Sequence, residues 1–345
     1  MGHEQVVFCH DEATGLKAII AIHNTILGPA LGGTRLWNYA TEEEALTDVL
    51  RLSRGMTYKA AATGLNLGGG KAVIIGTPSM KTEPFLRRFG KFIDSLGGKY
   101  VTAEDVNMKT RDIEYMAMET KHVTGRPESQ GGSGDPSPVT AYGTYMGMKA
   151  MAKKAYGSES LEGKRILVQG VGQVGMYLAE HLKKENAKIF IADIDDEKLK
   201  HVASKTGAEI IDNNKILDLS MDIYSPCALG AILNDETIPR LTCDIVAGAA
   251  NNQLKDDIKH GYKLMDRNIL YAPDFVINAG GLINVYLEHI NEYSKERSYQ
   301  MADKIYDSCL AIANRSEEQK ISPQEAAMEV AQDRIDAIGK IKVRR

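Results

Sequence analysis

The first third of the chain combines strand-like and helix-like hydrophobic patterns. Two apolar runs rich in Val and Ile, Gln5–Cys9 and Leu16–Ile22, are joined by turn residues and predict a β-hairpin. From Thr41 to Arg54 the apolar positions recur at helical spacing, and Thr41 with Glu44 has the pattern of a capping box. The other predicted elements are strands at Ala72–Ile75 and Lys99–Thr102 and helices at Pro84–Leu96 and about Arg111–His122. This part of the chain is therefore expected to be a mixed α/β domain.

The pattern changes beyond residue 138, where short apolar runs alternate with amphipathic stretches. This alternation predicts a parallel sheet with helices on both faces, since parallel strands are joined by crossover helices and are buried on both sides. The predicted strands are Arg165–Gln169, Lys188–Ala192, Met221–Tyr224, Asp244–Ala247 and Ile269–Tyr271. Two amphipathic helices, Ser298–Asn314 and Pro323–Ile338, are expected to follow.

The segment Gly125–Pro138 is rich in Gly, Pro and Ser and marks the clearest break in composition. A chain of 345 residues is longer than one hydrophobic core usually serves, so we expect two domains. The predicted ranges are residues 1–133 and residues 134–319. The last helix, at about 320–345, is expected to pack back on the first domain.

Composition and charge narrow the choice of partners and compartment. A net charge of -4 without a basic run argues against nucleic acid or a membrane surface as the main partner. The four cysteines stand far apart and no histidines have the spacing of metal ligands, so we expect reduced thiols and no metal site. We find neither an N-terminal secretory pattern nor an apolar run approaching the ~20 residues of a membrane helix. The cytoplasm is the expected compartment.

A glycine-rich motif follows the predicted strand Arg165–Gln169 and opens a helix: Gly170-Val171-Gly172-Gln173-Val174-Gly175. In a dinucleotide site Gly170 permits a tight turn and Gly172 lets the backbone approach a pyrophosphate. Gly175 permits close packing of helix on strand, and the helix N-terminus offers N–H groups to the anion. The alternative is a glycine-rich turn that binds nothing.

Asp193 ends the next predicted strand, where its carboxylate can accept hydrogen bonds from ribose hydroxyls. A 2'-phosphate beside Asp193 would be repelled, so NAD is favoured over NADP. Asp195 and Asp196 are interpreted as turn and helix-start residues. Strand, glycines, helix and acid in this order predict a Rossmann-type, doubly wound NAD-binding domain over residues 134–319.

Two lysines flank a stretch of small residues in the first domain. Lys71 follows Gly68-Gly69-Gly70, and Lys59 precedes the same stretch. Two such lysines can share the work on one amino acid, one holding its carboxylate and the other serving as a general base. Each could equally be a solvated surface group, and the glycines could serve packing alone. Glu104 and Asp105 follow a predicted strand, where a carboxylate can exchange protons with an amine or cap a helix.

Several blocks taken together resemble one enzyme family, the glutamate/leucine/phenylalanine/valine dehydrogenases, and its leucine-specific members most of all. The blocks run in family order from near residue 5 to about residue 340. They are Gly28–Arg35, Arg54–Lys59, Gly68–Lys71, Thr102–Val106, Pro226–Gly230, Ala249–Leu254 and Tyr271–Gly281.

The resemblance implies a role for each matching residue. Lys59 would bind the substrate carboxylate, and Lys71, in its uncharged form, would activate water against the imino carbon. Asp105 would exchange the proton of the amino group, and Asn278 would orient the substrate carboxylate. Thr140 and Asn252 would contact the cofactor beside the glycine loop. The resemblance also implies an N-terminal α/β domain that binds substrate and forms the oligomer, with a cleft toward the NAD-binding domain.

The same resemblance constrains the substrate. Glutamate-specific members carry a lysine where this chain has Leu31, beside Gly32, and a hydrocarbon side chain there would leave a buried carboxylate unpaired. Ala103, Leu282 and Val285 would complete an apolar pocket. The implied reaction is reversible oxidative deamination of leucine, valine or isoleucine to the 2-oxo acid, ammonia and NADH. An aromatic substrate such as tryptophan or phenylalanine stays open, as does the order among the branched-chain amino acids.

Two other classes of protein compete with this interpretation. A non-catalytic NAD-binding scaffold would be indicated by loss of Lys59, Lys71 or Asp105, and all three are present. A 2-hydroxy-acid dehydrogenase usually needs a histidine–acid pair, and no histidine here lies in such a motif. The family resemblance implies a homo-oligomer, either an octamer or a dimer. The direction of flux and any regulation stay open.

Overall fold

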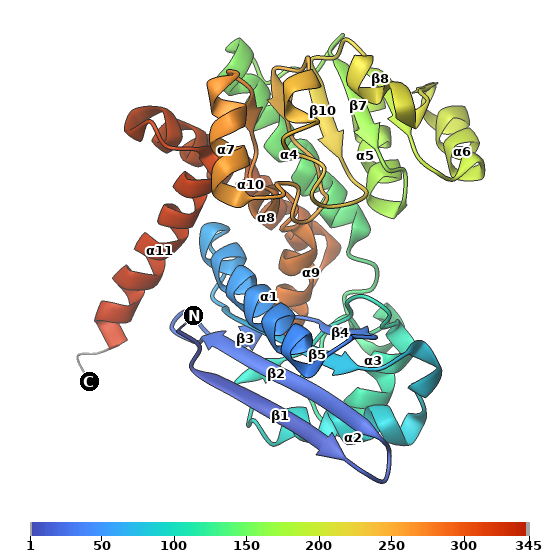
Figure 1. Ribbon diagram of the computed structural model, residues 1–345, viewed down its shortest axis with the longest axis vertical. Coiled ribbons are helices and arrows are strands. Elements are labelled where there is room, and N and C mark those ends of the chain that lie inside the picture. The colour runs from blue at the N-terminus through green and yellow to red at the C-terminus, as the bar shows by residue number, and fades with distance from the viewer. Residues whose placement is uncertain (1, 343–345) are drawn as a thin grey trace. The chain divides into compact units, whose positions relative to one another are not determined.

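The computed structural model describes residues 2–342 (Figure 1), and its contacts divide the chain into two compact units. Unit 1 comprises the residues up to Asp135, the segment Asn284–Ser294 and the chain from Ala331 on. Unit 2 comprises Pro136–Ile283 and Lys295–Val330. None of the helices within the described residues is long and apolar enough to cross a membrane.

These units differ from the expected ranges near the C-terminus, where segments alternate between them. Helix α9 (Gly280–His289) was expected in the second domain, but the boundary falls inside it. From Asn284 on it belongs to unit 1, where Glu288 accepts hydrogen bonds from the amides of Gly125 and Ser133 at 2.8 and 2.9 Å. Helix α11 (Pro323–Lys342) was expected to pack wholly on the first domain. Its beginning belongs to unit 2, where the Tyr262 hydroxyl donates to Glu325 at 2.6 Å.

The sheet of unit 1 has six strands within the described residues, in the order β1-β2-β5-β3-β6, with β4 also paired to β5. The strands are β1 Gln5–Asp11, β2 Leu16–Asn24, β3 Ala30–Leu31, β4 Thr34–Trp37, β5 Gly68–Ile75 and β6 Tyr100–Val101. The predicted hairpin is confirmed, since β1 pairs antiparallel with β2 along all of its length, from Gln5 opposite Ile22 to Asp11 opposite Leu16. Strands β3 and β4 both run parallel to β5 and place Leu31 and Arg35 beside it.

Three helices of unit 1 are α1 (Glu42–Ala62), α2 (Glu83–Asp94) and α3 (Thr110–Ala117). Helix α1 begins as predicted, with the Thr41 hydroxyl accepting from the Glu44 amide at 3.1 Å, whereas the Glu44 carboxylate caps the Ala40 amide instead of Thr41. It continues past the predicted end at Arg54. Helix α3 ends well short of His122, because the chain turns back there into a bridge between Thr102 and Val123.

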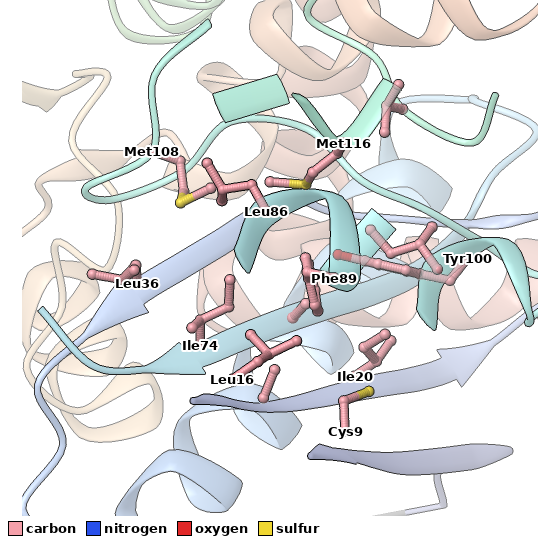
Figure 2. Close-up of a cluster of buried hydrophobic side chains, with 14 of the residues drawn as sticks. Cys9, Leu16, Ile20, Leu36, Ile74, Leu86, Phe89, Tyr100, Met108 and Met116 are labelled. Atoms are coloured by element: carbon pink, nitrogen blue, oxygen red, sulfur yellow. The ribbon is translucent and has the colours of Figure 1, made fainter. Parts of the chain in front are cut away.

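Helices cover both faces of this sheet. On one face, Phe85, Phe89 and Ile93 of α2 are fully buried in a cluster with side chains of the hairpin, β5 and β6. Figure 2 shows this cluster, in which Phe89 lies over Ile20 and Ile74. On the other face, Ala45 and Val49 of α1 join a second cluster with Ile19, Ala21 and Val73. The sheet thus lies between two apolar clusters, one on each face.

Unit 2 contains the predicted parallel sheet, with the strand order β12-β11-β10-β7-β8-β9 and parallel pairing throughout. Its strands are β7 Arg165–Gln169, β8 Lys188–Ala192, β9 Glu209–Ile210, β10 Ile223–Pro226, β11 Ile245–Val246 and β12 Leu270–Tyr271. Its helices are α4 Ser137–Tyr156, α5 Gln173–Lys184, α6 Asp196–Thr206, α7 Asp257–Asp266, α8 Asp274–Ile277 and α10 Lys295–Gln319. The order runs outward in two directions from β7, which is the doubly wound arrangement, and ligands of such sheets bind where the direction changes.

Candidate active site

Strand β5 carries Lys71 inside unit 1. The strand begins at Gly68 and not at Ala72 as predicted, so Lys71 is a strand residue. The preceding glycines serve close packing, since a Cβ at Gly69 would lie 2.1 Å from the Thr57 hydroxyl of α1 and one at Gly70 would lie 2.7 Å from the ring of Tyr100. Lys71 is therefore held in a tightly packed layer, and only 6% of the residue is exposed.

Asp105 lies opposite Lys71 on the segment that follows β6. The amides of Thr34 and Leu36 donate to the carbonyls of Ala103 and Val106, at 2.9 and 3.0 Å, so this segment is fastened along β4. Gly33 permits the approach, because a Cβ there would lie 2.4 Å from the Glu104 carbonyl oxygen. The Lys71 Nζ atom lies 2.9 Å from Asp105 Oδ2. The structure thus brings together two of the residues that the sequence analysis proposed for catalysis.

A third charged group, which the sequence analysis did not assign, contacts the same carboxylate. Arg35 on β4 donates from Nε to Asp105 Oδ2 at 3.1 Å. Burial alone would raise the pKa of Asp105, but the Lys71 and Arg35 cations outweigh it and hold the pKa below its ordinary value. The neighbouring Glu104 differs, because burial raises the pKa of its carboxyl. Of the two acids, Asp105 is therefore the one whose charged form the neighbouring cations stabilise.

Lys59 is carried by the last turn of α1, which extends eight residues beyond its predicted end at Arg54. It is half-buried, and its carbonyl accepts a hydrogen bond from the Thr63 hydroxyl at 2.7 Å. Because Thr57 of the same helix packs on Gly69 of β5, Lys59 and Lys71 are carried by two elements in direct contact.

Two of the residues expected to line an apolar pocket in unit 1 lie at the ends of adjoining strands, and a third lies on a helix. Leu31 is buried at the end of β3 with 1% exposure, and Ala103 follows β6 with 7%. Gly32 is buried against β5, where a Cβ would lie 1.8 Å from the Gly70 carbonyl oxygen, and its own carbonyl accepts from the Tyr100 hydroxyl at 2.6 Å. Val285 is half-buried on α9.

The glycine loop of unit 2 connects β7 to α5, as predicted. Gly170 has a φ of +96°, and a Cβ there would lie 2.6 Å from that of Ala228, so only glycine fits. A Cβ on Gly175 would lie 2.0 Å from the Gly170 carbonyl oxygen, which explains the close packing of helix on strand. At Gly172 nothing lies within 4 Å of an added Cβ. Gln173 and Val174 follow as the first residues of α5, so this open space borders the helix N-terminus.

Asp193 lies beside this loop, at the end of β8. Its carboxylate accepts from the Val171 amide at 2.7 Å and from the Asp195 amide at 3.0 Å. It therefore joins the loop to β8, and each oxygen keeps a second lone pair for a ligand. Asp195 is the N-cap of α6, as predicted. The sequence analysis missed two exposed apolar side chains, Ile194 and Leu229, which follow Asp193 and Ala228 and are 96% and 77% exposed.

The remaining cofactor and substrate candidates of unit 2 lie on α4, at the end of α8, at the start of α9 and on the loop that follows β11. Asn278 caps α8, is 6% exposed and donates to the Asn251 side chain at 2.7 Å. Its buried Oδ1 has no hydrogen-bond partner among the described residues, so it is ready to accept from a ligand. Asn252, with a φ of +51°, lies next to Asn251. Thr140 donates to the Pro136 carbonyl at 2.9 Å, and Leu282 is 6% exposed.

The residues of unit 2 fit a dinucleotide. The open space at the N-terminus of α5 suits a pyrophosphate, and the Asp193 carboxylate beside the glycine loop suits a ribose. The unpartnered amide oxygen of Asn278 suits a polar ring. Within residues 2–342, no cluster of three or more His, Cys, Asp or Glu could hold a metal ion.

Comparison with known proteins gives matches along nearly the whole chain. Residues 3–122 match the description "Glu/Leu/Phe/Val dehydrogenase, dimerisation domain", and residues 131–197 and 191–340 match "Glutamate/Leucine/Phenylalanine/Valine dehydrogenase". A leucine dehydrogenase of Thermoactinomyces intermedius is 52% identical over 341 residues, covering 99% of this chain and 93% of the relative. A valine dehydrogenase of Streptomyces virginiae is 48% identical over 344 residues, covering 97% and 94%.

The crystal structure of L-tryptophan dehydrogenase from Nostoc punctiforme is also similar. It superposes with a TM-score of 0.89 at 46% identity and covers 98% of this chain and 97% of that one. Relatives named for leucine, valine and tryptophan thus have comparable sequence identity to this chain.

Proposed function

The chain belongs to the glutamate/leucine/phenylalanine/valine dehydrogenase family, and from that premise we propose that it catalyses the reversible NAD-dependent oxidative deamination of a branched-chain L-amino acid. For leucine the reaction converts the amino acid, NAD+ and water to 4-methyl-2-oxopentanoate, an ammonium ion, NADH and a proton. The observation that carries the proposal is the contact of 2.9 Å between Lys71 on β5 and Asp105 on the segment after β6, which also carries Ala103.

The proposed chemistry divides between the charged residues of unit 1. Lys59 holds the α-carboxylate of the substrate. Asp105, ionised because of its cationic neighbours, accepts a proton from the substrate ammonium, which leaves the nitrogen lone pair free to form the imine. A bound NAD would supply the acceptor for the hydride that leaves the α-carbon. Lys71 in its uncharged form then takes a proton from the water that attacks the imino carbon. Asp105 returns its proton to the nitrogen of the resulting carbinolamine and then takes the hydroxyl proton as the carbonyl forms and ammonia leaves. Because Lys71 Nζ and Asp105 Oδ2 lie 2.9 Å apart, a proton can pass directly between them.

Residues of unit 2 hold the cofactor in this proposal. The amides at the start of α5 and the backbone of Gly172 bind the pyrophosphate, and Asp193 accepts from the ribose. Ile194 and Leu229 supply apolar surface for the adenine. Thr140, Asn252 and Asn278 bind nearer the nicotinamide, where Asn278 has an unused acceptor. The carboxylate of Asp193 disfavours a 2'-phosphate, which supports NAD over NADP.

The apolar character of Leu31, Ala103, Leu282 and Val285 supports an apolar side chain on the substrate and opposes glutamate. The leucine dehydrogenase at 52% identity favours leucine. An aromatic amino acid is the second candidate, since the L-tryptophan dehydrogenase structure superposes with a TM-score of 0.89. The same four apolar residues support either substrate class, so only the relative rates with each amino acid can distinguish the two proposals.

A substrate panel read by NADH absorbance tests the proposal. We expect the highest kcat/KM with leucine, valine or isoleucine, a lower value with phenylalanine and tryptophan, and none with glutamate. NAD should support turnover far better than NADP. The highest value with tryptophan would select the second candidate, and no oxidation of any amino acid would refute both.

We further propose a homo-oligomer and a cytoplasmic location. The description of the family match over residues 3–122 as a dimerisation domain supports self-association, which light scattering on the purified protein will measure. All four cysteines are free thiols, which supports a reducing compartment.

A further inference from the structure

We propose that Arg35 is a positioning residue that orients the Asp105 carboxylate and supplies the positive charge that stays beside it when Lys71 gives up its proton. The proposal deepens the function proposed above and rests on it. Arg35 stands out because it links Asp105 to a second carboxylate, that of Asp48 on another element.

Arg35 is held at two points of its side chain. Its Nε lies 3.1 Å from Asp105 Oδ2, and its Nη1 lies 3.0 Å from Asp48 Oδ2 on α1. Its side chain is 24% exposed, and those of Asp105 and Asp48 are 23% and 29% exposed. A guanidinium suits this place, since its planar fork can contact two carboxylates at once, whereas the single ammonium of lysine cannot keep both contacts.

The far end of this chain of contacts is also fixed. The Tyr39 hydroxyl donates to Asp48 Oδ2 at 2.5 Å. Burial and the Asp48 carboxylate raise the pKa of Tyr39, which favours its protonated, donating form. Although burial lowers the pKa of Arg35, its two carboxylate partners raise it further. The path from Tyr39 through Asp48 and Arg35 thus joins α1 to Asp105.

The arrangement of donors on Asp105 explains what the arginine does. Lys71 and Arg35 both contact Oδ2, and among residues 2–342 no donor contacts Oδ1. Oδ1 is therefore the oxygen that can receive the proton of the substrate amine. When Lys71 is uncharged, a buried carboxyl would tend to hold a proton and cease to be a base. Arg35 prevents this because a guanidinium does not lose its proton in proteins.

The test compares the wild-type enzyme with Arg35→Met, Arg35→Lys and Asp48→Asn. Arg35→Met should lower kcat at least tenfold and move the acid limb of the kcat/KM profile upward by about one pH unit, since Asp105 then needs a higher pH to ionise. Arg35→Lys should recover part of both effects. Asp48→Asn, which loosens Arg35 without removing it, should shift the same limb by less.

Arg87→Met is the matched control. Arg87 also contacts two carboxylates, those of Glu83 and Glu119, but it lies on the outer helix α2. Its loss should leave the kcat/KM profile unchanged. NADH binding should stay close to wild type in every variant while the acid limb moves, and a merely structural role for Arg35 would not move that limb.

A second readout is the titration of Asp105 itself, followed by 13C NMR of carboxyl-labelled aspartate and assigned with Asp105→Asn. The titration should move to higher pH in Arg35→Met; a midpoint equal to that of the wild type overturns the proposal. If Arg35→Met does not fold, an unshifted acid limb in Asp48→Asn overturns it instead. If the wild-type protein oxidises no amino acid, the proposed function fails, while the NMR midpoint still decides whether Arg35 controls Asp105.

Discussion

The two units of this protein prepare their ligand sites by different physical means. In unit 1 the candidate site consists of charged side chains that are largely buried and paired with one another, as in the contacts of Asp105 with Lys71 and Arg35. In unit 2 it consists of backbone amides and open space, with Gly172 free of neighbours and Asn278 presenting an unused acceptor. A site that moves protons needs fixed charges, whereas a site that binds a pyrophosphate needs exposed N–H groups.

This comparison predicts that the units can be damaged separately. Substitutions among the charges of unit 1 should impair turnover and leave the dinucleotide bound. Substitutions in the glycine loop should weaken dinucleotide binding and leave the charged network of unit 1 intact.

The largest effect is expected from Lys71→Ala. Loss of a general base lowers kcat by about 10²- to 10⁴-fold. NADH fluorescence titration should give the wild-type Kd, because the glycine loop is unchanged. Lys91→Ala, at a lysine that is 60% exposed on α2, is the control and should keep full activity. Undiminished turnover in Lys71→Ala would contradict the role assigned to this lysine.

The next largest effect is expected from Glu288→Ala, at a charged side chain of unit 1 that stabilises the fold. The Glu288 carboxylate is 1% exposed and accepts hydrogen bonds from the Ser133 amide at 2.9 Å, the Ser133 hydroxyl at 2.8 Å and Arg126 Nε at 3.2 Å. Glu288→Ala should lower the free energy of unfolding by about 3–5 kcal/mol, because it leaves buried donors without an acceptor. Urea unfolding measures this loss, and Glu83→Ala at an exposed pair is the control. A loss as small as that of the control would show that the buried carboxylate contributes little.

In unit 2, Gly175→Ala and Gly172→Ala should separate packing from binding. Gly175→Ala forces a Cβ to within 2.0 Å of the Gly170 carbonyl oxygen and should destabilise the protein. Overpacking of this kind costs about 1–3 kcal/mol. Gly172→Ala should change stability by less than about 0.5 kcal/mol. It should nevertheless weaken NADH binding, because its Cβ enters the space left for the pyrophosphate. Equal stability losses in the two variants would remove this distinction.

The smallest effect is a pH dependence of stability. The pKa of Asp105 is lower in the folded protein than in the unfolded chain, because the Lys71 and Arg35 cations outweigh burial. Its ionised form therefore stabilises the fold above the ordinary carboxyl pKa, and this contribution is lost as the pH falls through the lowered folded value. The stability difference between wild type and Asp105→Asn, measured by urea unfolding, should accordingly shrink between neutral pH and pH 3. A difference that is constant over this interval would mean that the cations do not favour the charged form.

Local sequence patterns were sufficient to predict many of the elements of unit 2 and the outline of unit 1. The bounds of β7 and β8, the turn at Gly170 and the cap at Asp195 agree with the structure. Each depends on residues close together in the chain, where strand periodicity, a left-handed glycine and a side-chain cap act over a few positions. The hairpin of β1 and β2 belongs to the same class.

Tertiary contacts decided the rest. Strand β5 starts at Gly68 because α1 and the ring of Tyr100 pack against glycines that look like loop residues in the sequence. The Arg35–Asp105 bond spans 70 positions and the Glu288–Ser133 bond 155, so no local pattern indicates either one. The sequence by itself determined which residue types were available for proton transfer and nucleotide binding. Only the folded chain determined which charges meet, because ion pairing depends on distance in space and not on separation along the chain.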